Sequence, residues 1–253
     1  KDSSLWCVRL WCIYGDCRTM AKILCVRIGE KYGPEYETYL EKKLPEHEFI
    51  WIREPYHDQV TLQWNKMWGM QLDIDEPICV MDIDVLLVND YKKVFDYPIQ
   101  RGEFVAMPGW WRDDSTKYKI NGGFFKYFPK DCKYIYDKFM SDIHKWQRYY
   151  IDNGTTRGPV NGEQYFGSDS VNEKLKIKLL PNEWFIRWVA NKTPLSGYQT
   201  EKDFMFKITE KYVNKTGNDY AYLGQEFHPD IKFVHFTHSS NKPHEWKDYE
   251  IFK

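Results

Sequence analysis

Two aspartates interrupt one of the most apolar stretches of this chain, the segment ICVMDIDVLLVND at 78–90. The apolar run predicts a buried strand at 78–82, so Asp82 and Asp84 stand at its carboxyl end. Burying an isolated carboxylate is costly, but two carboxylates at i and i+2 can share one Mg²⁺ or Mn²⁺, which neutralises them. Open α/β sheets bind ligands beyond the carboxyl ends of their strands. The segment therefore predicts a divalent-metal site in preference to a solvated strand end.

Strand-like and helix-like segments alternate from residue 22 onward. The first five are expected as strand 22–28, helix 34–44, strand 48–52, helix 59–70 and strand 78–82. The later ones are expected as strands 103–107 and 123–127, helices 131–148, 162–174 and 201–213, and a last strand ending near 237. Continuous apolar strands are typical of a parallel sheet covered on both faces. The pattern predicts an α/β fold with a mostly parallel central sheet flanked by helices.

The sequence shows no boundary between domains after residue 20. It has 253 residues, of which 42% are hydrophobic and 18% aromatic, enough for one large core or two small ones. No low-complexity linker and no internal repeat divides the sequence. We expect one domain over 20–253. We interpret 1–19, whose CVRL echoes the CVRI at 25–28, as an N-terminal extension or a remnant of expression.

Charge and hydropathy exclude some partners. The net charge of −1 gives no strong field for nucleic acid or for an anionic membrane. No apolar run approaches the roughly 18 residues of a membrane span, and no secretory signal pattern stands out. The first three of the six cysteines are spaced by five residues, which fits no zinc or redox pattern, so we expect reduced thiols, with Cys25 and Cys79 packed inside apolar strands. Together these features predict a cytoplasmic protein with no nucleic-acid partner and no membrane span.

An apolar strand followed by D-x-D is also typical of HAD-type phosphatases, in which the first Asp is a nucleophile and the second an acid or base. In those enzymes the motif opens the domain and a small polar turn follows it. Here the motif lies well inside the chain and Val85 and Leu86 follow. A phosphatase that uses Asp82 and Asp84 is kept as an alternative.

Six motifs in order carry a closer resemblance. They are CVRIGEKYGPEY at 25–36, TLQWNKMWGM at 61–70, MDIDVLLVND at 81–90, KINGGFFKY at 119–127, VNGEQYF at 160–166 and FVHFTHSSNKPHEW at 233–246. With these motifs the chain resembles the GT-A fold glycosyltransferases, in particular the glycogenin-like family 8 group. The resemblance covers nearly all of 20–253 and implies a single Rossmann-like GT-A domain.

The resemblance assigns residues to the donor. It implies that Asp82 and Asp84 hold a divalent ion on the diphosphate of the donor. Tyr32 would stack on the base, uracil or guanine, and Lys66 would point at the donor. In the last motif Lys242 would grip the diphosphate.

The third protein ligand of the metal would be a histidine of the last motif. His235 begins an HFT string as in the family, but Lys242 follows it by seven residues where the family has six. His238 lies four residues before Lys242, as in a related variant of the motif. One of the two histidines is expected to bind the metal, and the spacing favours His238.

The resemblance also assigns residues to the reacting sugar. Asn121 would bind sugar hydroxyls, and Glu163 and Gln164 would lie at the reacting sugar, where the family often has Asp-Gln. The implied activity is transfer from a UDP- or GDP-sugar to a glycan or other hydroxyl acceptor, with Mn²⁺ (or Mg²⁺) and retention of configuration. Inversion would need a base such as Glu163 or Asp113. An inactive carbohydrate-binding domain of the same fold is the other alternative, against which the intact D-x-D argues.

Overall fold

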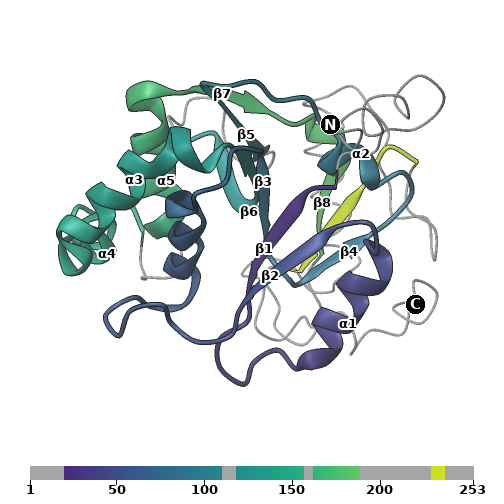
Figure 1. The fold of residues 1–253 in the computed structure, drawn as a ribbon, viewed down its shortest axis with the longest axis horizontal. Coiled ribbons are helices and arrows are strands. Elements are labelled where there is room, and N and C mark those ends of the chain that lie inside the picture. The colour runs from purple at the N-terminus through teal and green to yellow at the C-terminus, as the bar shows by residue number, and fades with distance from the viewer. Residues whose placement is uncertain (1–19, 110–117, 157–161, 189–228, 237–253) are drawn as a thin grey trace, which may run out of the picture.

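The structure is a computed structural model that describes residues 20–109, 118–156, 162–188 and 229–236 (Figure 1). The larger sheet has the strand order β2–β1–β3–β6–β5–β7. Its strands are β1 (Lys22–Val26), β2 (Glu48–Ile52), β3 (Ile78–Met81), β5 (Glu103–Pro108), β6 (Ile120–Tyr127) and β7 (Lys176–Leu179). Strand β1 is parallel to β2 and β3, and β5 is parallel to β7, whereas β6 is antiparallel to both of its neighbours. The sheet is therefore mixed and mostly parallel, as predicted.

A smaller sheet has the order β4–β9–β8. Its strands are β4 (Val85–Leu87), β8 (Phe185–Trp188) and β9 (Phe233–Phe236). Strand β9 is antiparallel to β4 and parallel to β8. None of these pairings follows from an apolar pattern alone, because they join segments far apart in the chain. The smaller sheet matters for the site because it carries a histidine back to the D-x-D segment.

Helices cover both faces of the larger sheet (Figure 1). The helices are α1 (Pro34–Lys43), the 3-10 helix η1 (Leu62–Gln71), α2 (Lys92–Phe95), α3 (Pro129–Ser141), α4 (Ile143–Asp152), α5 (Gly162–Lys174) and the short 3-10 helix η3 (Asn182–Trp184). Ile23 and Cys25 of β1 pack on the side of α1, α2 and the smaller sheet. Leu24 between them packs on the opposite side, with η1, α3 and α5. Successive side chains of a strand point to opposite faces, so an uninterrupted apolar strand needs both layers.

The structure corrects two predicted helices. The helix expected at 131–148 is two helices, because Asp142 leaves helical geometry and its side chain accepts the N–H of Lys145 as the N-cap of α4. The helix expected at 59–70 is the 3-10 helix η1, which begins at Leu62. The helix expected at 201–213 lies outside the described residues. The short strands β4, β7 and β8 were not predicted.

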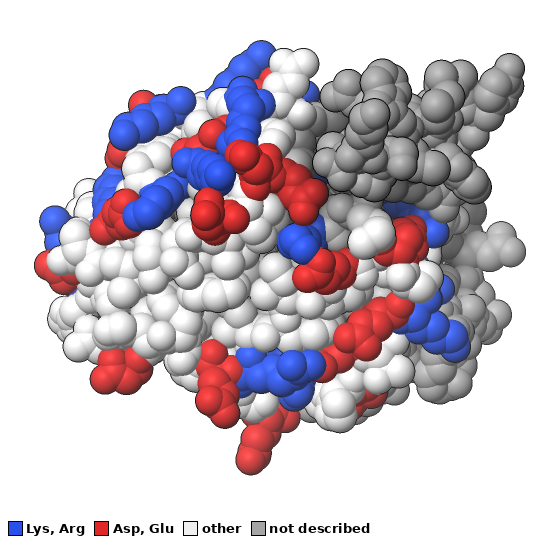
Figure 2. Space-filling model, in the orientation of Figure 1, with Lys and Arg blue, Asp and Glu red and all other residues white. Residues whose placement is uncertain are grey.

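The described surface agrees with the near-neutral composition. In Figure 2 positive and negative side chains are interspersed, with no large patch of one sign on that face. Within the described residues no helix is both long and apolar enough to cross a membrane. Cys25, Cys79 and Cys132 are buried free thiols.

Candidate active site

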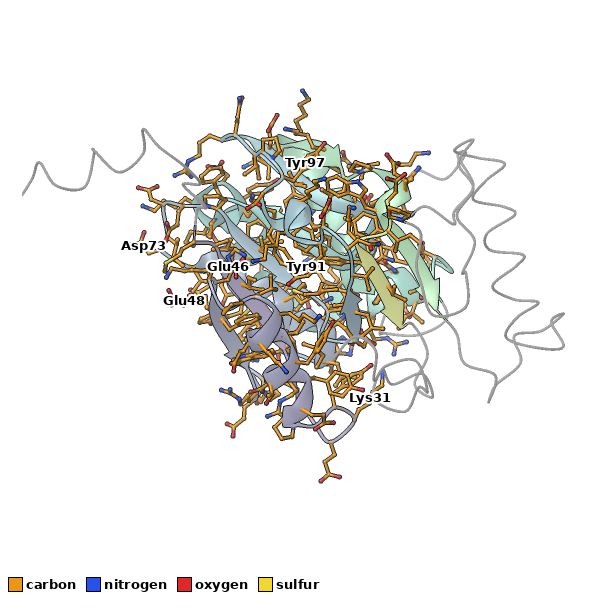
Figure 3. The ribbon with its side chains drawn as sticks, turned by 90° about the vertical axis from the view of Figure 1, so that its right-hand side faces the viewer. Lys31, Glu46, Glu48, Asp73, Tyr91 and Tyr97 are labelled. Carbon is orange, nitrogen blue, oxygen red and sulfur yellow. The ribbon has the colours of Figure 1, made fainter. Side chains whose placement is uncertain are left out.

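A cavity of about 690 Å³ opens where β1 and β3 end. Its walls come from the loop after β1, from η1, from the segment between β3 and β4, and from the starts of β6 and α5. In Figure 3 the labelled Lys31 lies in the loop that leads into α1. Glu48, the first residue of β2, and Asp73, which precedes β3, lie toward the other end of the strands. The cavity is thus at the carboxyl edge of the sheet, where the sequence predicted a site.

Asp82, Asp84 and His235 converge in this cavity. Asp82 directly follows β3, Asp84 directly precedes β4, and His235 lies on β9 opposite Val85. This register brings the imidazole to both carboxylates: His235 Nε2 lies 3.2 Å from Asp82 Oδ2 and 3.5 Å from Asp84 Oδ1. One potential ligand atom of each of the three residues lies within 4.8 Å of the other two. The backbone pairing of the smaller sheet therefore builds a compact cluster of two oxygens and one nitrogen.

This donor set fits a divalent ion. Carboxylate oxygens are the ligands preferred by Mg²⁺ and Mn²⁺, and an imidazole favours Mn²⁺ over Mg²⁺. Such ions usually take about six ligands, so three protein ligands leave positions for substrate oxygens and water. The side chains of Asp82, Asp84 and His235 are 23%, 14% and 8% exposed, so the cluster is partly desolvated but open to the cavity.

In the metal-free protein, a proton on the His235 imidazole supplies positive charge beside the two carboxylates. Burial disfavours the charged form of His235, but its hydrogen bonds to Asp82 and Asp84 outweigh burial and raise its pKa to about 9. Burial likewise works against ionised Asp82, yet Lys66 and His235 hold the pKa of this carboxyl well below its usual range. At pH 7 an imidazolium therefore lies between two carboxylates. A metal that binds through Nε2 must displace that proton.

Lys66 comes from η1 and is buried, with 3% of its side chain exposed. Its ammonium contacts Asp82 Oδ1, donates to the carbonyl of Gly122 at 2.8 Å, and lies 4.0 Å from Glu163 Oε1. Burial opposes its charge, but Asp82 and Glu163 outweigh burial and raise its pKa. The resemblance implied that Lys66 points at the donor. The structure places it on the cavity wall, with its charge on Asp82.

The N-G-G segment at the start of β6 also reaches the cavity. The ladder between β5 and β6 loses its register at 122–124, which frees this part of β6 from regular pairing on one side. Asn121 Oδ1 accepts the N–H of Gly123 at 2.6 Å, and the carbonyl of Gly123 accepts the N–H of Asp82 at 3.0 Å. These bonds tie the segment directly to the D-x-D loop.

Glu163 and Gln164 lie in the first turn of α5 and face the same segment. Gln164 Oε1 accepts the N–H of Gly122 at 3.3 Å. A Cβ atom on Gly122 would lie only 2.6 Å from Glu163 Oε1, so the acid depends on a glycine at this position. Burial raises the pKa of Glu163 to about 7, an effect that Lys66 opposes and Asp82 supports. A carboxyl group that titrates near neutral pH can hold or release a proton during a reaction.

Tyr32 lies in the loop between β1 and α1. Its hydroxyl donates to Asp84 Oδ2 at 2.6 Å. Burial, reinforced by Asp84, raises its pKa strongly, so it stays protonated and donates. The ring meets the edge of Tyr36 at 4.9 Å between centroids, and the Lys31 ammonium lies 4.4 Å from its centroid. Stacking of Tyr32 on a base stays a prediction.

Some predicted residues lie outside the described part of the chain, namely Lys242, His238 and Asp113. Lys31 was missed: it lines the cavity next to Tyr32, and its place beside that tyrosine in the first motif was the available signal. The hydroxyl contact of Tyr32 with Asp84 had no signal in the sequence, because the two residues are 52 positions apart.

Comparisons with known proteins agree with the geometry only at the level of fold. No protein-family model matches the chain, and no curated protein sequence matches it. A solved structure of the glycosyltransferase GlyE from Streptococcus pneumoniae TIGR4 is similar, with a TM-score of 0.53 and 10% identity over 92% of this chain and 60% of that chain. The bifunctional glycosyltransferase WbbM is also similar, with a TM-score of 0.50 and 11% identity over 95% of this chain and 50% of that chain. The chain thus spans 60% or less of these two solved chains. The predicted GT-A glycosyltransferase fold is confirmed.

Proposed function

We propose that this chain transfers a sugar from a nucleotide-sugar donor, a UDP- or GDP-sugar, to a glycan or another hydroxyl acceptor. The observation that carries the proposal is the convergence of Asp82, Asp84 and His235 in the carboxyl-edge cavity, beside the buried acid Glu163. The GT-A fold supports it, since the two similar structures named above are of glycosyltransferases. Fold alone does not fix an activity, so the proposal depends on this cluster.

In this proposal Asp82, Asp84 and His235 hold one Mn²⁺ or Mg²⁺. When bound, the ion supplies positive charge that offsets the negative charge growing on the leaving diphosphate. Lys66 keeps Asp82 ionised and so keeps it available as a ligand. Lys242 is proposed to bind the diphosphate as well. His235 is preferred to His238 as the third ligand because its Nε2 already lies beside both carboxylates.

The other cavity residues act on the sugar. The bond from the anomeric carbon to the diphosphate oxygen breaks, and a bond from the acceptor hydroxyl oxygen to that carbon forms. Asn121 and Gln164 orient the sugar, which is the entropic part of the catalysis. With retention, as the resemblance implies, the acceptor proton leaves with the diphosphate. With inversion a carboxylate takes it, and Glu163 has a pKa suited to that task.

The alternatives meet specific obstacles. A phosphatase nucleophile needs a carboxylate oxygen that can attack phosphorus. Asp82 Oδ1 contacts Lys66 and Oδ2 lies 3.2 Å from His235 Nε2, so in the metal-free protein neither oxygen is free to attack. A binding domain without activity would not need the cluster of metal-ligand atoms that Asp82, Asp84 and His235 form.

The test is release of nucleoside diphosphate from a panel of UDP- and GDP-sugars with Mn²⁺, with and without a glycan acceptor. We expect slow hydrolysis of one donor by the parent protein and none by Asp82→Asn or Asp84→Asn. The matched control is Asp90→Asn, which changes an aspartate of the same segment whose side chain is 68% exposed and contacts Lys93. This variant should match the parent.

Three results would redirect the proposal. Release of phosphate from simple monoesters, lost in Asp82→Asn, would favour the phosphatase. A donor that raises the melting temperature with Mn²⁺ but is never cleaved, with or without acceptor, would favour the binding domain. Neither cleavage nor stabilisation by any donor with Mn²⁺ would refute the transferase.

A further inference from the structure

The two carboxylates of the D-x-D pair are held in the same manner. Asp82 directs Oδ2 to His235 Nε2 at 3.2 Å while its Oδ1 takes the ammonium of Lys66. Asp84 directs Oδ1 to His235 Nε2 at 3.5 Å while its Oδ2 takes the hydroxyl of Tyr32 at 2.6 Å. Each carboxylate therefore has one oxygen in the cluster and one oxygen bound by a protein donor.

Such an arrangement matters because a carboxylate turns easily. The terminal torsion of an aspartate is broad and roughly two-fold, so without a partner Asp84 would present either oxygen, or both. A donor on Oδ2 leaves Oδ1 as the single oxygen that faces the cluster. Outer partners of this kind fix the orientation of a metal ligand and typically change metal affinity by 10–100-fold when removed.

The loop that carries Tyr32 is itself anchored. Arg27, the residue after β1, donates from Nη1 to the carbonyl of Tyr32 at 3.4 Å and from Nε to Glu37 of α1. Glu37 is buried and also accepts from Arg53, at 2.7 Å from Nη2 and 3.1 Å from Nε. Two arginines and one buried acid thus fasten the loop to β1, to the residue following β2, and to α1.

We propose that Tyr32 is a positioning residue for the metal site: its hydroxyl orients Asp84, so the loop after β1 and the divalent-ion site form one linked unit. Binding of a divalent ion at this site rests on the proposed function. The orienting role of the Tyr32 hydroxyl does not depend on sugar transfer. Because Tyr32 also lines the cavity, a ligand that displaces this side chain changes metal affinity, and the metal changes the affinity for that ligand by the same factor.

The test is the dissociation constant of Mn²⁺, measured by the electron paramagnetic resonance signal of free Mn²⁺ without nucleotide. Tyr32→Phe keeps the ring and removes the hydroxyl, and we expect about tenfold weaker Mn²⁺ binding. Tyr36→Phe is the matched control, because it removes a hydroxyl from the ring that packs against Tyr32. It should bind Mn²⁺ within twofold of the parent protein.

A double-mutant cycle separates orientation of Asp84 from general loop packing. In an Asp84→Ala background there is no carboxylate to orient, so adding Tyr32→Phe should change Mn²⁺ affinity less than twofold. A tenfold loss that persists in that background would overturn the proposal. Parent-like Mn²⁺ binding by Tyr32→Phe, or an equal loss in Tyr36→Phe, would overturn it as well.

The same measurements separate this inference from the proposed function. Mn²⁺ binding that depends on the Tyr32 hydroxyl, in a protein that cleaves no nucleotide-sugar, supports the positioning role and refutes the transferase. Cleavage of a donor, together with Mn²⁺ binding that does not depend on the Tyr32 hydroxyl, supports the transferase and refutes the positioning role. A parent protein that binds no Mn²⁺ overturns the positioning role.

Discussion

Replacing Gly122 with alanine places a methyl group against the carboxyl of Glu163. The added Cβ would lie 2.6 Å from Glu163 Oε1 and 3.5 Å from Gln164 Cβ. Ordinary contact begins at 3.4 Å, so the carboxyl oxygen must move by about 3.4 − 2.6 = 0.8 Å. The contact with Gln164 is already acceptable. The strain therefore falls on the acid, which is the far end of a flexible side chain.

The expected effects on stability and activity differ in size. A side chain forced off its preferred rotamer by about 30° costs roughly 0.5–1.5 kcal/mol, so the free energy of unfolding should fall by about 1 kcal/mol. A displacement of about 1 Å at a reacting group can cost about 100-fold in rate. We expect a folded Gly122→Ala protein whose hydrolysis of the nucleotide-sugar donor is about 100-fold slower.

A second substitution tests the cause. Glu163→Asp shortens the acid by one carbon–carbon bond, about 1.5 Å, which makes room for the methyl group. In Gly122→Ala with Glu163→Asp the two effects on unfolding should not add, and the double variant should be more stable than the sum predicts. The control is Gly167→Ala in α5, where an added Cβ meets no atom within 4 Å. It should keep its activity and gain about 0.5–1 kcal/mol, because alanine suits a helix interior better than glycine.

Urea unfolding and donor hydrolysis on the four proteins of the cycle decide the matter. Additive losses of stability would show that the methyl group and the acid do not meet. A Gly122→Ala protein as active as the parent would show that the position of the Glu163 carboxyl is irrelevant to the reaction. Either result refutes the role assigned to Gly122 in the N-G-G segment.

Three further predictions concern charge. Burial raises the pKa of Glu163 from 4.5 to about 7, so the folded state binds this proton more tightly than the unfolded state. The free energy of unfolding should therefore fall by roughly 3 kcal/mol as pH rises from 4.5 to 7. Urea titrations of Glu163→Gln should show no such dependence on pH. Since the pKa of His235 is raised to about 9, Mn²⁺ binding at pH 7 should release about one proton, which calorimetry detects as heats that depend on the buffer. His235→Ala should lose this proton release and bind Mn²⁺ about 100-fold more weakly. Parent-like Mn²⁺ binding by His235→Ala would disprove that His235 is a metal ligand. Lys66→Met should destabilise the metal-free protein by about 3 kcal/mol, because Asp82 loses its buried partner. If Mn²⁺ does not lessen this loss of stability, Asp82 is not a ligand of the metal.

Much of the fold was predictable because its signals are local. The strands near residues 22, 48 and 78 are continuous apolar runs, and such runs need covering layers on both faces. The break at Asp142 was not predicted, since the apolar stripe continues from Cys132 through Ile143 on both sides of it. Only the capping bond of Asp142 to Lys145 ends one helix and starts the next.

The candidate site also combines residues with a local signal in the sequence and residues without one. The apolar run before Asp82 was enough to predict that Asp82 and Asp84 end a buried strand. Burial makes two such carboxylates costly unless something neutralises them. The resemblance to the GT-A glycosyltransferases left the third ligand open between two histidines, with the spacing in favour of His238. The tertiary structure brings His235 to both carboxylates, through a strand pairing of β9 with β4.

Contacts between parts of the chain that are remote in sequence depend on the tertiary structure and had no signal in the sequence. The Tyr32 hydroxyl donates to Asp84, which lies 52 positions away in the sequence. Gly122, where the pairing of β6 with β5 is irregular, lies next to the carboxyl of Glu163 in α5. The sequence specified which chemical groups are present and which strand end they follow, because apolar periodicity is encoded residue by residue. Which oxygen faces which donor was decided by sheet register and loop anchoring, and these depend on side-chain packing between distant segments.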